Sequence, residues 1–275
     1  MSLLLFFFML GLAIGSFLNV VIERGEQGKS LTGRSHCDTC HKTLSWRELI
    51  PLVSFVRQKG RCAHCSAVLS LQYPLMELGT GLVFAFVGWY VFYATLTNSS
   101  LEFFLIACIF LVAASAMIVI IVADFNYHII PNGATLLLAL LGVAAVMVRN
   151  NIVRLSSNMV HAPVSWSGAL WDLAASIGAV LFFFCLWHFS KGRAMGFGDV
   201  KLIGATSLAL GFPLSLVAVL FAFWIGGLAG VVMLLLRARG LKSEIAFGPF
   251  IIIGTILAFL FGHAFLLYSG FAYVF

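Results

Sequence analysis

Two aspartates at the ends of apolar segments are the residues of this chain best suited to chemistry. Asp199 follows Gly196-Phe197-Gly198 and precedes the hydrophobic run 202–210, and Asp124 directly follows the apolar run 105–123. An ionisable side chain beside or within a membrane is costly, so each is a candidate functional residue. Two close carboxyl groups that share one proton can activate water and protonate a carbonyl oxygen. The pair therefore predicts an aspartyl peptidase with Asp124 and Asp199 as catalytic residues.

The neighbours of Asp199 support this prediction. Gly196 and Gly198 would permit positive φ and the close approach of a substrate backbone. Lys201 would balance local charge or contact a lipid phosphate. In the structural alternative, each aspartate only caps or ends a helix.

A transporter is the alternative functional class. Acidic residues in membrane helices also relay protons or bind cations, so the same aspartates could serve a cation or proton transporter. Internal repeats and broken helices, which are common in transporters, are not evident in the sequence. The hydrolase patterns Gly-x-Ser-x-Gly and His-Glu-x-x-His do not occur in it either.

Four cysteines form a second candidate site. Cys37-x-x-Cys40 and Cys62-x-x-Cys65 are separated by 21 residues. Two such pairs are the usual source of four thiolates for tetrahedral zinc, and a closed four-sulfur site leaves no open position for catalysis. The spacing predicts a structural Zn²⁺ held by Cys37, Cys40, Cys62 and Cys65, with His36, His41 and His64 as further potential ligands.

Composition places these residues in a membrane protein. Of 275 residues 62% are hydrophobic and 9% are charged, and the mean hydropathy is +1.08. Such a chain is an all-α polytopic membrane protein. About eight membrane helices are expected, over 2–22, 75–96, 101–123, 133–148, 168–189, 200–210, 214–236 and 248–268.

The positive charges predict the orientation. The formal net charge is +6, and eight of the sixteen Lys and Arg residues lie between Arg24 and Arg61. If 23–72, 124–132, 190–201 and 237–247 are cytoplasmic, fourteen of the sixteen lie inside, as the positive-inside rule favours. This places Asp124 and Asp199 at the same, cytoplasmic, face. The distribution of Lys and Arg is explained by the orientation of the chain in the membrane, so no nucleic-acid partner is expected.

Three regions follow from these patterns. Residues 1–22 form a first transmembrane helix, 23–73 a cytoplasmic zinc loop domain with four cysteines, and 74–275 a membrane helical aspartyl peptidase domain. Glu77, near the start of the second long helix, either complements the helix dipole or binds an amine or cofactor.

The motifs together resemble a known family. Residues Gly196 to Leu202 resemble the Gly-x-Gly-Asp signature of type IV prepilin peptidases. Asp124 followed by Asn132 after Pro131 resembles that family's other catalytic motif, and Asn126 and Asn132 stand where members often carry acids. Further matches lie at residues 15–21 and 246–250, so the resemblance covers nearly the whole chain.

The resemblance implies a specific activity. Members with a cysteine-bearing cytoplasmic domain cleave the basic leader of prepilins or pseudopilins after a Gly. They then methylate the new N-terminal amine with S-adenosylmethionine. It further implies a bacterial cytoplasmic (inner) membrane location, with roles in type IV pili or type II secretion. Neither the S-adenosylmethionine site nor the oligomeric state follows from the sequence.

Overall fold

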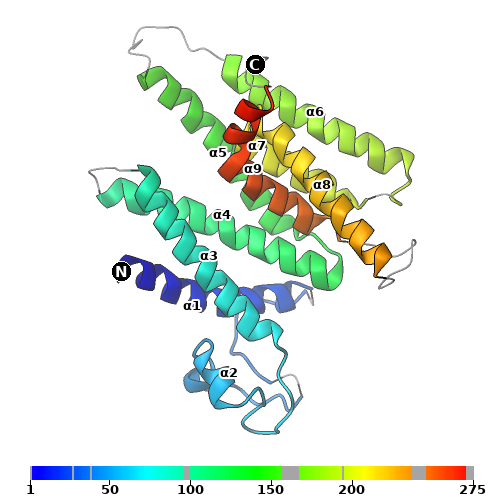
Figure 1. The fold of residues 1–275 in the computed structure, drawn as a ribbon. Helices are drawn as coiled ribbons and strands as arrows, with labels where there is room; N and C mark the ends of the chain where they lie inside the picture. The colour runs from blue at the N-terminus through cyan, green and yellow to red at the C-terminus, as the bar shows by residue number, and fades with distance from the viewer. Residues whose placement is uncertain are drawn as a thin grey trace. The chain divides into compact units, whose positions relative to one another are not determined.

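A computed structural model shows a nearly all-helical protein (Figure 1). The structure describes residues 2–26, 28–37, 39–95, 100–156, 167–193, 195–236 and 246–270. The elements are α1 (Ser2–Glu26), η1 (Trp46–Glu48), α2 (Val53–Arg57), α3 (Gln72–Thr95), α4 (Ser100–Tyr127), α5 (Asn132–Ser156), α6 (Ser167–Phe189), α7 (Phe197–Leu210), α8 (Leu214–Leu235) and α9 (Gly248–Tyr268).

The all-α polytopic class is confirmed. Among the described residues, six helices are long and apolar enough to cross a membrane, namely α1, α3, α4, α6, α8 and α9, and α5 contains a shorter apolar stretch, Asn132–Met147. With the short α7, these match the eight expected helices one for one. The predicted cytoplasmic loop 237–247 lies outside the described residues except for its last two.

Two helix ends differ from the expected ones at the positions that matter for chemistry. α4 continues to Tyr127, so Asp124 lies in its last turn and not beyond it. α7 begins at Phe197, so Asp199 lies within its first turn. Both aspartates are thus held by helical backbone, which restricts where their side chains can point.

The chain forms two compact units, Met1–Val119 and Ile120–Phe275, and α4 passes from one to the other. In the first unit α1 packs against α3. A Cβ added at Gly11 would lie 2.7 Å from the Cα of Gly81, so the two backbones approach closely there. Small residues allow such contacts between membrane helices. The predicted division at residues 22 and 73 stays a prediction.

The second unit is built around α7. This helix contacts α5, α6, α8 and α9, and Leu202, Ile203 and Ala205 are almost fully buried. A helix that is apolar on all sides is suited to such a central position.

The turn after α7 is held by a side chain of α6. The backbone N–H of Phe212 donates to Oδ1 of Asp172 over 2.7 Å, and the Trp171 ring stacks on the Phe212 ring with centroids 5.9 Å apart. Asp172 is itself buried. This third membrane aspartate was not among the residues predicted from the sequence to have a role.

Candidate active site and metal site

Asp199 is buried at the N-terminal end of α7, with 6% of its surface exposed. Its Oδ2 accepts a hydrogen bond of 3.1 Å from the backbone N–H of Gly196, the residue that precedes the helix. A carboxylate in the first turn also suits the helix dipole. The backbone therefore fixes one oxygen of this carboxyl group.

Asp124 is held in the same way by a different helix. It is 5% exposed, and its Oδ2 accepts a hydrogen bond of 2.9 Å from the backbone N–H of Gly248, the first residue of α9. A Cβ added at Gly248 would lie only 2.6 Å from that oxygen. Only glycine therefore fits beside Asp124 without moving its carboxyl group.

The structure brings the two predicted aspartates together within the second unit. They are close enough for the charge of Asp124 to act on Asp199. Ile130 lies beside Gly198, the neighbour of Asp199, and beside Gly248, the partner of Asp124: added Cβ atoms there would lie 3.1 Å from Cβ and 3.4 Å from Cδ1 of Ile130. Two buried carboxyl groups that interact electrostatically form a candidate site for shared-proton chemistry.

The expected role of the two flanking glycines was partly wrong. Gly196 has a φ of −75° and ψ of 153°, and neither Gly196 nor Gly198 has positive φ. Gly196 has the extended backbone that is usual for the residue before a helix, which any residue can adopt. Gly198 allows a different close contact, since an added Cβ would lie 3.1 Å from Cβ of Ile130 and this side chain would have to shift.

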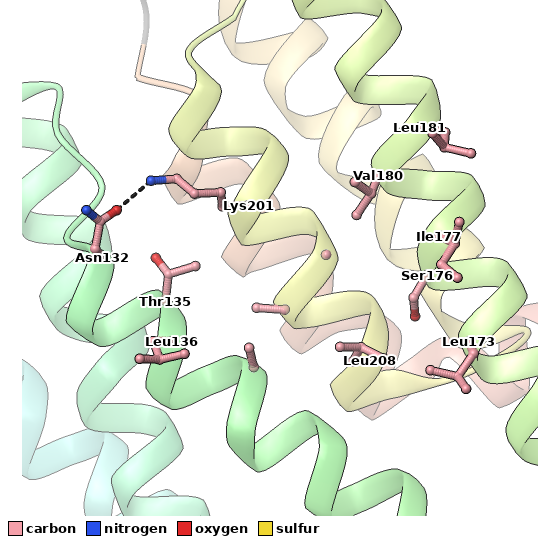
Figure 2. A pocket seen from close by; sticks show the side chains of 13 residues that line it. Asn132, Thr135, Leu136, Leu173, Ser176, Ile177, Val180, Leu181, Lys201 and Leu208 are labelled. Atoms are coloured by element: carbon pink, nitrogen blue, oxygen red, sulfur yellow. Dashed lines mark hydrogen bonds between the residues drawn. The ribbon is translucent and has the colours of Figure 1, made fainter.

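Lys201 connects the two motifs. Its Nζ donates a hydrogen bond to Oδ1 of Asn132, the first residue of α5 (Figure 2). The same ammonium lies 5.6 Å from the centroid of the Phe197 ring. The sequence predicted charge balance or a lipid contact for Lys201 and did not predict Asn132 as its partner, because Asn132 is 69 residues away in the chain.

A mostly apolar groove of about 660 Å³ lies between α5 and α6, with α7 at its floor, and Lys201 and Asn132 lie at one end of it (Figure 2). Its α7 residues are Lys201, Gly204, Ala205 and Leu208. Residues two positions apart on a helix point about 200° apart, so Asp199 faces the other side of α7. The groove is therefore separate from the pair of carboxyl groups.

The four cysteines form one cluster in the first unit. The sulfur atoms of Cys37, Cys40, Cys62 and Cys65 lie within 4.8 Å of one another, and those of Cys37 and Cys65 are 3.9 Å apart. A tetrahedron with Zn–S bonds of about 2.3 Å has edges of about 3.8 Å. The thiol set thus fits zinc in both chemistry and spacing.

The two cysteine loops have the same backbone structure, 25 residues apart. The N–H of Cys37 donates to the carbonyl of Lys42, and the N–H of Cys62 to that of Ala67. His41 and Ser66 have φ of 56° and 58° at the equivalent turn. This internal repeat, readable as Cys-x-x-Cys-x-x-x-Leu-Ser in both places, was missed in the sequence analysis.

Protonation of the thiols is uneven. The pKa of Cys37 is lowered to about 6 because the backbone N–H groups of Cys40 and Thr39 donate to its sulfur. The Ala67 N–H lowers the pKa of Cys65. Loss of water contact and the neighbouring thiols of Cys62, Cys40 and Cys37 have a larger, opposite effect, so the pKa is raised overall, to about 11. A bound Zn²⁺ would offset the mutual repulsion of the four thiolates, because thiols that coordinate the metal are deprotonated.

The nearby His64 has a different partner. Its Nε2 lies 3.2 Å from Oε1 of Glu48, and Oε2 of Glu48 accepts hydrogen bonds from the hydroxyl and the N–H of Ser45. The hydroxyl and then the N–H of Ser45 lower the pKa of Glu48. His64 therefore links η1 to the second cysteine loop.

Removing thiols from both loops tests the metal site. We expect the Cys37→Ser/Cys62→Ser double variant to lose the roughly one Zn²⁺ per chain that four thiolates would hold, measured by elemental analysis of purified protein. Cys108→Ser/Cys185→Ser is the control, because these cysteines are exposed on helices and outside the cluster. Zinc retained at full stoichiometry by the first variant would refute the site.

Comparison with known proteins identifies the family. Residues 9–91 match the "Bacterial Peptidase A24 N-terminal domain", and residues 111–231 match the "Type IV leader peptidase family". A Bacillus subtilis (strain 168) protein named "Prepilin leader peptidase/N-methyltransferase" is 32% identical over 256 residues, 93% of each chain. The chain belongs to the type IV leader peptidase family.

Other members give the same picture. A Neisseria gonorrhoeae protein of the same name is 31% identical over 266 residues, covering 87% of this chain and 84% of its own. One from Klebsiella pneumoniae is 29% identical over 229 residues, covering 75% and 85%. No solved structure matches the chain.

Membership decides between the functional classes considered from the sequence. The predictions of an enzyme and of this family are confirmed, and the transporter alternative has no support. The leader peptidase match contains both Asp124 and Asp199, and the N-terminal match contains all four clustered cysteines. Gly248 lies beyond either match, and sequence reasoning gave it no role.

Proposed function

We propose that this membrane enzyme cleaves the leader peptide of type IV prepilins or pseudopilins and then methylates the new N-terminal amine. Its relatives carry both activities in their names. The observation that carries the proposal is the pair of buried carboxyl groups, Asp124 and Asp199, each anchored by a backbone N–H.

In the proposed hydrolysis the two carboxyl groups hold one proton between them. The ionised group takes a proton from water, and the resulting hydroxide adds to the scissile carbonyl carbon. The protonated group gives its proton to the carbonyl oxygen. The C–N bond then breaks, and the amine leaves with the proton first taken from water. One hydroxyl of the intermediate returns its proton to the pair as the new carboxyl group forms, which restores the starting state. We assign the two roles to the pair and not to single residues.

The anchoring explains how such a pair stays aligned. Gly196 and Gly248 each hold one Oδ2, which leaves Oδ1 of each carboxyl group for water or substrate. Gly198, Lys201 and Asn132 support the geometry by fixing the start of α7 against Ile130 and α5. Positioning of this kind accounts for a large part of catalysis when reacting groups must lie within about 3 to 3.5 Å.

The charges and the aspartates support a proposal for the membrane location. We place the enzyme in the bacterial inner membrane with the carboxyl pair near the cytoplasmic face. The basic leader would then remain in the cytoplasm, where the positive-inside rule favours it, and the apolar helix of the pilin would remain in the bilayer. Cleavage between the two requires a catalytic pair at the boundary.

For methyl transfer, S-adenosylmethionine supplies the methyl group to the amine released by cleavage. We assign none of the described residues to this cofactor. The zinc we propose has a structural role, since four thiolates fill its coordination sphere.

A single assay tests both activities. Purified protein is incubated with a prepilin and methyl-labelled S-adenosylmethionine, and the product is analysed by mass spectrometry. We expect a pilin shortened by its leader, with the label on its new N-terminal residue. Cleavage without label would restrict the enzyme to peptidase activity, and no cleavage would refute the proposal.

A further inference from the structure

The segment from Trp46 to Lys59, here called the η1–α2 segment, exposes large apolar side chains. Trp46 is 68% exposed, Val53 59% and Val56 74%. Val53 and Val56 are three residues apart and so share a face of α2. A cluster of exposed apolar side chains marks a surface that binds a partner.

The same segment is basic. Arg47, Arg57 and Lys59 are exposed, and the Arg47 guanidinium lies 5.2 Å from the centroid of the Trp46 ring. The one acid in the segment, Glu48, is engaged by Ser45 and His64. The partner must therefore combine apolar groups with negative charge.

A hydrogen bond fixes the depth of this segment relative to α3. The N–H of Leu52 donates over 2.7 Å to Oε2 of Glu77, a buried residue five positions into α3 and thus about 7.5 Å along its axis. α3 is one of the helices able to cross the membrane. Leu52 has a φ of 60° and a ψ of −47°, a backbone conformation that is uncommon for a residue other than glycine.

The short length of α2 keeps it at that depth. Its five residues extend about 7.5 Å. Even if it pointed straight away from the bilayer, it would end level with the start of α3. The polar headgroup layer is about 5 to 8 Å thick on each side, so α2 stays within or beside that layer.

We propose that the η1–α2 segment is a docking surface for anionic phospholipids. Trp46, Val53 and Val56 contact the boundary of the acyl region, and Arg47, Arg57 and Lys59 contact headgroup phosphates. Aromatic and basic side chains commonly occupy this depth. A basic prepilin leader fits the surface less well, because both carry positive charge.

The test uses the full-length protein in nanodiscs of phosphatidylcholine, with and without phosphatidylglycerol. We expect amide hydrogen exchange over residues 46–59 to be several-fold slower in the anionic discs. Brominated lipid should quench a component of the tryptophan fluorescence that is missing in Trp46→Phe. Both effects should be lost in Arg47→Gln/Arg57→Gln/Lys59→Gln and weakened in Val53→Ser/Val56→Ser.

The control variant is Lys29→Gln/Lys42→Gln, which removes charge from exposed lysines of the same loop outside the segment. It should behave as the unchanged protein. Equal exchange in both lipid mixtures and no Trp46 quenching would overturn the proposal. Protection that appears only on adding a prepilin, whatever the lipid, would also overturn it and assign the surface to substrate.

Discussion

Replacing Asp124 or Asp199 by Asn should reduce prepilin cleavage by at least about 10³-fold, the upper range for loss of a positioned acid or base. An amide oxygen can still accept the N–H of Gly248 or Gly196, so the backbone anchors survive. The Asn amide cannot accept a proton from water or donate one to the scissile carbonyl oxygen, and hydrolysis requires both. The measurement is the rate of leader removal by purified variants, at matched stability in thermal unfolding.

This substitution separates catalysis from helix capping. If the aspartates only capped α7 and ended α4, Asn would serve nearly as well, and full cleavage by both variants would refute the peptidase site. Asp172→Asn is the matched control, because this buried aspartate also accepts a backbone N–H, that of Phe212. We expect its cleavage rate to stay within a few-fold of the unchanged protein.

Gly248→Ala should reduce cleavage by about 10²-fold, the loss expected when a catalytic group is displaced by about 1 Å. The added Cβ would lie 2.6 Å from Oδ2 and 3.2 Å from Cγ of Asp124, so the carboxyl group must move. The measurement is the rate constant for cleavage at saturating prepilin, because the expected loss is in the chemical step.

Gly227→Ala provides the matched control. Gly227 lies in α8, and a Cβ there meets nothing within 4 Å. Alanine is favoured over glycine in a helix by roughly 1 kcal/mol, so this variant should be at least as stable and fully active. Similar activity of the Gly248 and Gly227 variants would show that Asp124 does not depend on the space beside Gly248.

Much of the fold was predictable because its signals are local. Apolar runs located the eight expected helices to within a few residues, apart from the extension of α5 to Ser156. The spacing of Cys37, Cys40, Cys62 and Cys65 predicted a cluster that the structure contains. The catalytic role of Asp124 and Asp199 stays a prediction, although the structure brings them together.

The partners of these residues were not predictable, because they come from distant parts of the chain. The bond from Gly248 to Asp124 joins residues 124 positions apart. Glu77 was considered for the helix dipole or for an amine, but it binds the N–H of Leu52, 25 positions earlier. Such pairs depend on how helices pack, and no local pattern of residue types records that.

The bond between Asp172 and Phe212 has a consequence for the bilayer. α7 has 14 residues and is about 21 Å long, whereas the hydrocarbon core is about 30 Å thick. If α7 starts at one surface, its last residue lies about 9 Å short of the other. If α6 starts at that other surface, Asp172, five residues and thus about 7.5 Å along it, lies at a similar depth. At that depth the Asp172 carboxyl group accepts the hydrogen bond from the Phe212 N–H, a role that water cannot fill within the hydrocarbon core.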